Sequence, residues 1–208
     1  MRKIAVGRVV GLMIAASGVT ASVYYACDSY RRNKEFHRWF EDRPIHFTVD
    51  LSKPGDVTVP FHQTCGTSHG EALFIKLTPD VESDDEIGEL FDGFSATIII
   101  SDADGTEIEQ ATIGKSTIER WNGSEDLLLT DIAPFQKGEY LATLRVEATA
   151  PQLANREQVI YAKYQLCGLE QFPAFIVGAF SLGAGIIGVG ASICVVPNLR
   201  RHGFRRDT

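Results

Sequence analysis

Charged residues are absent from two long stretches of this 208-residue chain, and both stretches are strongly apolar. The first runs from Val9 to Cys27 and the second from Phe172 to Val196. Because a helix rises about 1.5 Å per residue, roughly 20 apolar residues are enough to cross the ~30 Å hydrocarbon core of a bilayer. The sequence therefore predicts two transmembrane helices, one in residues 1–27 and the other in residues 171–198.

Neither stretch holds an Asp, Glu, Lys, Arg or His at mid-depth, where such residues mark the paths of ions and substrates. Two helices are also too few to enclose a path on their own. These two absences argue against a channel or a transporter.

Basic residues are scarce between the two stretches. Residues 44–170 contain 22 Asp and Glu against 8 Lys and Arg, a net charge of about −14. Such a surface repels nucleic acid, which excludes a nucleic-acid partner. The two tails are basic instead, including the last segment, 199–208, and basic flanks stay on the cytoplasmic side of a membrane. We therefore expect both termini in the cytoplasm, the spans in the cytoplasmic (inner) membrane, and the middle domain in the periplasm or outside the cell.

The first apolar stretch has alternatives to a retained anchor. Met1-Arg2-Lys3 before an apolar run is also typical of a secretory signal, and Val19-Thr20-Ala21 offers small residues for cleavage. Tyr24-Tyr25-Ala26-Cys27 resembles a lipoprotein cleavage box, although Tyr24 is bulkier than expected. The run exceeds the roughly 7–15 residues of a signal's apolar region, which favours the anchor. All three alternatives export the middle domain.

Both predicted helices carry small residues at steps of three and four, a spacing that lets helix backbones approach closely. Three explanations of this spacing remain open. The two helices pack on each other, they pack on a partner protein or a second copy of the chain, or the small residues have no special role. The helix-packing candidates are Gly7, Gly11, Ala15, Gly18, Gly178, Ser181, Gly185, Gly188 and Ser192.

Residues 28–43 predict a juxtamembrane amphipathic helix that continues out of the membrane or bends along its surface. Phe36, Trp39 and Phe40 fall on one helical face, and the helix should end before Pro44. This segment has a net charge of about +1 on the predicted outer side, which argues weakly against the topology above.

From residue 44 to 168 the apolar pattern changes to a period of two, interrupted by turn residues. About eight short strands with no long helical pattern predict an all-β sandwich, jelly-roll-like. Gly138-Glu139-Tyr140 resembles the tyrosine-bearing corners of such sandwiches. The predicted strands are residues 45–51, 57–61, 72–77, 95–100, 106–113, 125–132, 139–148 and 159–166.

Cysteine is rare, with four residues in the chain. Cys65 and Cys167 are the two in the middle domain, and in an oxidising compartment we expect them to form a disulfide. Cys27 and Cys194 fall at the end of one span and inside the other, where they indicate small packing residues.

No set of residues in the chain predicts a catalytic or metal centre. His62, Cys65 and His69 offer metal-ligand types, but their spacing matches no standard site. Ser68 and His69 are adjacent, and neighbours on an extended chain point in opposite directions, so they do not predict a catalytic dyad. We therefore predict a protein that is not an enzyme and has no cofactor.

Acidic residues cluster in two places. Seven carboxylates lie within Asp80–Asp92, which we predict to be a mobile solvated loop, with calcium binding through Asp84 and Asp85 as an alternative. Asp102-Ala103-Asp104-Gly105 predicts a turn, and a calcium site that uses Asp102 and Asp104 is the less favoured alternative. Asn122-Gly123-Ser124 fits the N-glycosylation pattern, beside Trp121, a surface contact or a core residue.

Taken together, these features predict a membrane-anchored, non-enzymatic interaction protein. Its acidic extracytoplasmic β-sandwich would contact other proteins or a second copy, as an accessory or structural subunit of a membrane complex. One alternative is a calcium- or glycan-binding module at the sandwich loops. Another is a metal-dependent or redox enzyme that uses His62, Cys65 and His69.

Overall fold

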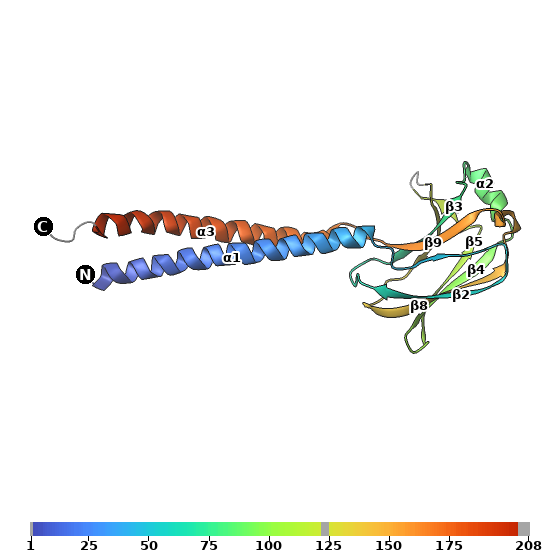
Figure 1. Cartoon of the computed structure of the whole chain (residues 1–208), viewed down its shortest axis with the longest axis horizontal. Helices are drawn as coiled ribbons and strands as arrows, with labels where there is room; N and C mark the ends of the chain where they lie inside the picture. Colours follow the sequence, from blue (N-terminus) through green and yellow to red (C-terminus); the bar gives the residue numbers. More distant parts are fainter. Residues whose placement is uncertain (1, 122–124, 204–208) are drawn as a thin grey trace. The chain divides into compact units, whose positions relative to one another are not determined.

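The computed structural model describes residues 2–121 and 125–203, and the side chains of residues 9–121 and 125–194. The chain divides into two compact units (Figure 1). The first consists of Met1–His37 with Gly168–Thr208, and the second of Arg38–Cys167. The predicted glycosylation pattern at Asn122 lies outside the described residues.

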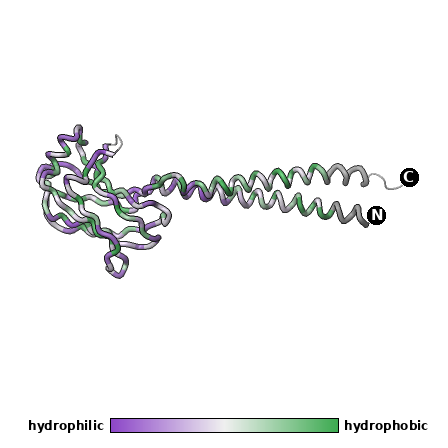
Figure 2. Tube along the Cα trace, turned by 180° about the vertical axis from the view of Figure 1, so that it is seen from behind, coloured by the Kyte–Doolittle hydropathy of each residue, from purple (hydrophilic) through white to green (hydrophobic). Residues whose placement is uncertain are grey.

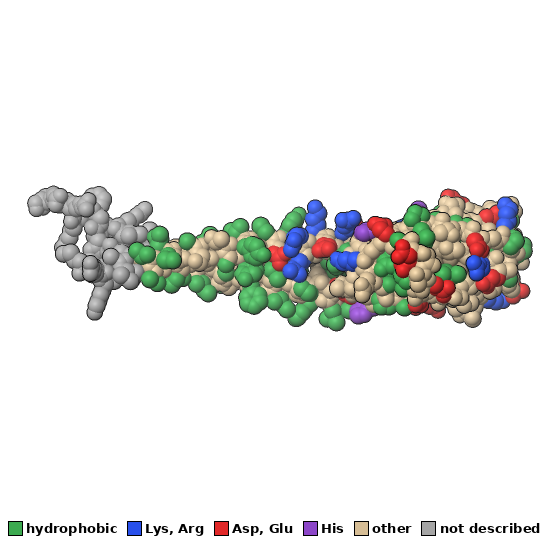
Figure 3. Space-filling model, turned by 90° about the horizontal axis from the view of Figure 1, so that it is seen from below, with side chains coloured by type: hydrophobic (Ala, Val, Ile, Leu, Met, Phe, Trp, Pro, Cys, Tyr) green, Lys and Arg blue, Asp and Glu red, His purple; other side chains and the backbone are tan. Residues whose placement is uncertain are grey.

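The first unit is a pair of long helices, α1 (Arg2–Glu41) and α3 (Phe172–Gly203), which lie side by side (Figures 1 and 2). A short 3-10 helix, η2 (Leu169–Gln171), precedes α3. Both helices contain a segment long and apolar enough to cross a membrane, within Val9–Glu41 and Leu169–Cys194. Hydrophobic side chains follow the visible face of the pair, and Lys and Arg side chains gather at the end away from the two termini (Figure 3).

Helix α1 continues without a break through the segment expected to form a juxtamembrane helix. Asp28 accepts ion pairs from Arg31 and Arg32, at 2.6 and 2.8 Å, one turn further along the same helix. The helix ends at Glu41, three residues before Pro44, because the residue before a proline avoids helical angles.

The second unit contains two antiparallel sheets, with nine strands among the described residues. Together with the two apolar helices, they confirm the predicted β-sandwich flanked by helices. The five-stranded sheet has the order β1-β9-β3-β7-β6, and the four-stranded sheet the order β2-β8-β4-β5. The strands are β1 (His46–Thr48), β2 (Gly55–Gln63), β3 (Glu71–Thr78), β4 (Ser95–Asp102), β5 (Glu107–Gly114), β6 (Glu119–Arg120), β7 (Leu127–Ile132), β8 (Gly138–Ala148) and β9 (Glu157–Tyr164).

Apart from the two-residue β6, the strands pair in a nested order. β1 pairs with β9, β2 with β8, β3 with β7, and β4 with β5. The chain therefore folds back on itself about a point between β4 and β5, so residues from its beginning and end become neighbours. Tyr140, at the start of β8, donates a hydrogen bond from its hydroxyl to the Gln136 carbonyl at 2.9 Å, as in a tyrosine corner.

The hydrophobic core lies between the sheets because alternate residues of each strand point inward. Leu73 and Ile75 of β3 belong to this core together with Ile98 and Ile100 of β4, and all four are almost completely buried. Burying each such side chain contributes about 1.5–3 kcal/mol. A short helix, α2 (Asp84–Leu90), and the 3-10 helix η1 (Pro151–Leu153) add Ile87, Leu90 and Leu153 to this core.

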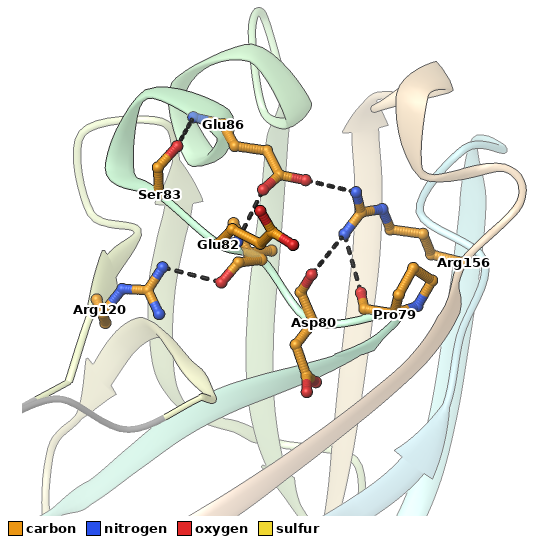
Figure 4. A network of polar contacts seen from close by, with 8 residues as sticks. Pro79, Asp80, Glu82, Ser83, Glu86, Arg120 and Arg156 are labelled. Atoms are coloured by element: carbon orange, nitrogen blue, oxygen red, sulfur yellow. Dashed lines mark hydrogen bonds and ion pairs between the residues drawn. The ribbon is translucent and has the colours of Figure 1, made fainter.

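Helix α2 corrects the prediction that the acidic segment after Asp80 is a mobile loop. Ser83 caps the helix by accepting the Glu86 backbone N–H, and Arg156 forms an ion pair with Glu86 at 2.5 Å (Figure 4). Arg156 also donates to the carbonyls of Pro79 and Asp80, at 2.9 and 3.4 Å. The buried apolar face of α2 and this arginine order a segment whose carboxylates suggested solvation.

The predicted disulfide is also corrected, because the structure contains no bond between Cys65 and Cys167. Cys65 is fully buried beside Thr67, with its Sγ 3.7 Å from the Thr67 hydroxyl oxygen. Cys167 is exposed beyond the end of β9, and its Sγ lies 3.0 Å from His69 Nε2. The two thiols thus occupy different surroundings, one inside the domain and one on its surface.

Candidate binding groove

A cluster of mostly aromatic side chains lies on the outer face of the five-stranded sheet, separate from the hydrophobic core between the sheets. Phe74 of β3 and Tyr161 of β9 are register partners, and both point away from the sandwich. Their rings stack at a centroid distance of 5.5 Å and an angle of 19°. Trp121 meets the edge of the Phe74 ring at 6.0 Å, and Ala72 and Leu128 complete the cluster.

Two cations lie against these rings. The Arg43 guanidinium is 4.2 Å from the Tyr161 ring centroid, and Lys163 Nζ is 5.3 Å from the centroids of both Phe74 and Tyr161. The faces of aromatic rings attract cations at such distances. Two positive charges therefore lie beside the aromatic rings on one face of a domain that is acidic overall.

The Tyr161 hydroxyl donates a hydrogen bond to the Asp126 carboxylate. Burial, followed by this hydrogen bond and the Asp126 charge, raises the pKa of Tyr161 above its ordinary value. The phenol consequently stays protonated at any physiological pH. Its bond to Asp126 fixes the ring on which Arg43 and Lys163 lie.

An open groove of about 580 Å³ runs beside this cluster. Phe74, Trp121 and Lys163 line one part of it, and Phe40 and Tyr164 line another. Phe40 and Trp121 are 69% and 40% exposed, so aromatic surface in the groove is open to solvent. Its volume lies in the range of roughly 300–1,000 Å³ that is typical of binding sites.

His69 and Cys167 form the polar end of the groove. His69 Nε2 lies 3.0 Å from Cys167 Sγ, although the two residues are 98 positions apart in the chain. Two backbone hydrogen bonds join their segments: His69 N–H donates to the Gln165 carbonyl and Gln165 N–H to the Gly70 carbonyl, at 3.0 and 2.9 Å. The groove thus combines apolar ring surface with a hydrogen-bonding end.

The three metal-ligand candidates do not converge. His62 faces outward from β2, where its Nδ1 is 2.7 Å from Glu139 Oε1. Cys65 is buried, and His69 lies in the groove. The alternation of the strand explains part of this separation, since His62 points to solvent while the next residue, Gln63, points inward.

The acidic candidates have structural roles. Asp102 Oδ1 accepts the backbone N–H groups of Asp104 and Thr106, at 3.0 and 2.8 Å, which forms the turn between β4 and β5. Asp84 and Asp85 lie in the first turn of α2, where the helix dipole stabilises carboxylates. Asp84 also meets Arg120 at 3.5 Å.

Most of the described helix-packing candidates lie between α1 and α3. A Cβ added to Gly18 would be 2.6 Å from Gly188 Cα, and one added to Gly185 would be 2.9 Å from the Ser22 hydroxyl oxygen. The Ser181 hydroxyl donates to the Ser22 carbonyl at 2.8 Å.

The remaining candidates are placed as follows. Gly178 faces Ser29 on α1, and Ala15 is buried. Ser192 instead bonds the Gly188 carbonyl of its own helix at 2.8 Å. Gly11 lies within α1, and the surroundings of Gly7 fall outside the described side chains.

Sequence reasoning found Trp121 and His69 but missed Phe74, Tyr161, Arg43 and Lys163. The available signal was the unbroken apolar run Ala72–Ile75, which is typical of a strand buried on both faces. Such a run indicates that the outer face of β3 is covered or in contact with something, in this case an aromatic cluster.

No protein-family model matches the chain, and no curated protein matches it. Among solved structures, the chain is similar to a protein from Sulfurospirillum deleyianum, known from a crystal structure. The two are 15% identical, with a TM-score of 0.43, over 61% of this chain and 99% of the other.

Proposed function

We propose that this chain is a membrane-anchored, non-enzymatic interaction protein, such as an accessory or structural subunit of a membrane complex. The observation that carries the proposal is the groove on the outer face of the five-stranded sheet, which exposes aromatic rings beside cations. The partner is another protein, bound through this groove.

The membrane location rests on the helix pair. Leu182 and Ile186 are 71% and 74% exposed on α3, and Val9 and Met13 are likewise exposed on α1. Leaving each large apolar side chain in water forgoes about 1.5–3 kcal/mol of burial, so a lipid environment suits these surfaces. An antiparallel pair with basic tails supports cytoplasmic termini and a periplasmic or extracellular domain.

The two outer faces of the sandwich differ, which favours one of them for contact. On the four-stranded sheet, polar residues on the outer face pair with one another: the Thr58 and Thr143 hydroxyl oxygens are 3.0 Å apart, and Arg145 meets Asp56 at 3.2 Å. Over the five-stranded sheet, the groove instead exposes Trp121 beside the buried ring of Phe74. Exposed apolar surface of this kind marks interaction sites. The nested strand pairing supports the narrower description of the domain as a jelly roll, which has two such outer faces.

The positive charges beside the groove indicate which kind of polypeptide segment would bind there. We propose that the groove accepts a polypeptide segment that places an apolar side chain against Phe74 and Trp121 and a carboxylate near Lys163. Residues 44–170 carry a net charge of about −14, so an acidic segment is attracted close to Lys163 and Arg43 and repelled by the domain as a whole. This local attraction would fix the register of the bound segment.

Site-specific photocrosslinking in the native membrane tests this function. A benzophenone amino acid replaces Trp121 in the groove, or Thr58 on the outer face of the four-stranded sheet as the matched control. We expect a discrete crosslinked protein from position 121 and none from position 58. Crosslinks to a second copy of this chain identify a homo-oligomer. Equal labelling from both positions, or none from either, contradicts the proposal, and binding of cell-wall sugars by the purified chain would favour the glycan-binding alternative.

A further inference from the structure

Two polar side chains that the groove does not use are buried together at one end of the sandwich. Gln63 is the last residue of β2 in the four-stranded sheet, and Glu71 is the first residue of β3 in the five-stranded sheet. Both are 0% exposed. Gln63 Nε2 donates to Glu71 Oε1 at 2.7 Å and to the Cys65 carbonyl at 2.9 Å. The contact therefore ties one sheet to the other.

The segment 64–70 closes over this pair. The Ser68 hydroxyl donates to Glu71 Oε1 at 3.2 Å, so a hydrogen bond joins the segment to the Glu71 carboxyl group. At the other end of the segment, the Gly70 backbone lies close to β7. A Cβ added to Gly70 would be only 2.5 Å from the Ile132 carbonyl oxygen. His69, between these two attachments, lines the groove.

Two oxygen atoms of the pair lack a donor. Within the described part of the chain, Gln63 Oε1 and Glu71 Oε2 are buried and accept no hydrogen bond. Buried polar atoms almost always have a partner, and leaving one without a partner destabilises the folded state. A proton on Glu71 removes the buried negative charge, whereas its loss leaves that charge on a carboxylate whose Oε2 accepts no hydrogen bond.

The surroundings favour the protonated form. Burial raises the pKa of Glu71 to about 7, against the opposing hydrogen bonds from Gln63 and Ser68. No basic side chain among the described residues contributes to this shift. The titratable and charged groups on the segment and on the elements around it come from several places. Cys65 and His69 lie in the segment itself, Tyr164 and Lys163 on β9, and Asp131 on β7. The Lys137 side chain lies against Gly66, and Asp42 reaches the segment through the Thr64 hydroxyl.

We propose that Gln63 and Glu71 form a proton-dependent clasp that holds segment 64–70 closed and thereby sets the position of His69 in the groove. With Glu71 protonated, the cross-sheet contact is neutral and the segment stays down. When Glu71 loses its proton, the buried charge is relieved by opening the segment to water. The clasp regulates the binding groove beside Phe74 and Trp121. The clasp itself does not depend on the proposed function, but its role in controlling partner binding does.

Hydrogen exchange of segment 64–70, in the full-length chain held in nanodiscs, tests the clasp without any partner. After correction for the intrinsic pH dependence of exchange, we expect the opening equilibrium to increase by about 30-fold between pH 5.5 and pH 8.5, with its main change near pH 7. Glu71→Gln, which mimics the protonated form, should change less than twofold. Glu139→Gln, which removes an exposed carboxylate on β8, should keep the wild-type response.

A flat wild-type profile, or a change centred near pH 4.5, overturns the clasp even if Glu71→Gln fails to fold. The link to His69 is measured by alkylating Cys167 and quantifying its peptide by mass spectrometry. Wild type and Glu71→Gln should react at the same rate at pH 5.5 and differ at least threefold at pH 8.5. Equal rates at both pH values contradict the coupling. A failed crosslinking experiment at Trp121 would leave these outcomes unchanged, so the two proposals fail separately.

Discussion

At the scale of single residues, Glu71 makes the stability of the domain depend on pH. Its pKa is about 7 in the folded chain and near 4.5 when exposed, so the folded state holds its proton more tightly. Stability should therefore be highest below pH 4.5 with respect to this group, fall as the pH rises to about 7, and level off above. The whole difference is about 3 kcal/mol.

Denaturant unfolding of the full chain in detergent, at pH 5 and pH 8, measures this prediction. Glu71→Gln should be more stable than wild type at pH 8, by up to about 3 kcal/mol, and close to it at pH 5. A variant that is less stable than wild type at pH 8 would show that Glu71 is stabilised as a carboxylate, which contradicts the sign argued here.

Ser83 is the residue on which the start of α2 depends. Its hydroxyl oxygen accepts the Glu86 N–H at 3.2 Å, and Glu86 in turn accepts the Glu82 N–H at 2.8 Å. Ser83→Ala removes the cap and should destabilise the domain by about 1 kcal/mol. Thermal unfolding measures the loss. Ser83→Asp keeps a capping oxygen and should restore stability, and an equal loss in both variants would rule out the cap as the cause.

At the scale of elements, the sequence predicts what depends on local pattern. Strand β8 follows from alternation, because one of its faces is buried in a core that selects apolar residues at every second position. Helix α2 was missed although Ser83 and Glu86 have the spacing of a capping box, since its carboxylates outnumber its apolar residues. The pairing of Phe74 with Tyr161 joins positions 87 apart and depends on strand register, which no local pattern encodes.

The pairing of α1 with α3 depends on close backbone approach. Gly188 lies against Gly18 and Val19, where a Cβ would be 2.7 Å from the Val19 nitrogen. Gly188→Val should therefore separate the helices at this level. Gly183→Ala is the matched control, since no described atom beyond its own stretch of helix lies within 4 Å of a Cβ at that position.

Disulfide trapping measures the separation. The hydroxyl oxygens of Ser22 and Ser181 are 3.5 Å apart, so cysteines placed at both positions, in a chain otherwise free of cysteine, should crosslink on oxidation. We expect the bond to form with Gly183→Ala and to decrease at least fivefold with Gly188→Val. Unchanged trapping with Gly188→Val would show that the helices do not meet at this glycine.

At the scale of the whole molecule, the distribution of charge and apolar surface predicts the topology. The middle domain is acidic and both tails are basic, and each of the two helices contains an apolar stretch long enough to cross a membrane. Moving the basic tails across a membrane is opposed by the positive-inside rule, whereas a folded acidic domain is exported largely regardless of its charge. The chain should therefore have its strands on one side of the membrane and its termini on the other.

Labelling with a membrane-impermeant maleimide tests this topology in spheroplasts. In a background without native cysteines, Thr58→Cys on β2 should react before permeabilisation, because Thr58 is exposed on the outer face of its sheet. Arg206→Cys in the C-terminal tail should react only after permeabilisation. The opposite order would place the domain in the cytoplasm, and reaction at both sites in sealed spheroplasts would mean that the helices do not span the membrane. The proposed function requires the groove to bind a partner on the outer side of the membrane. Either of these two outcomes would therefore contradict the proposed function.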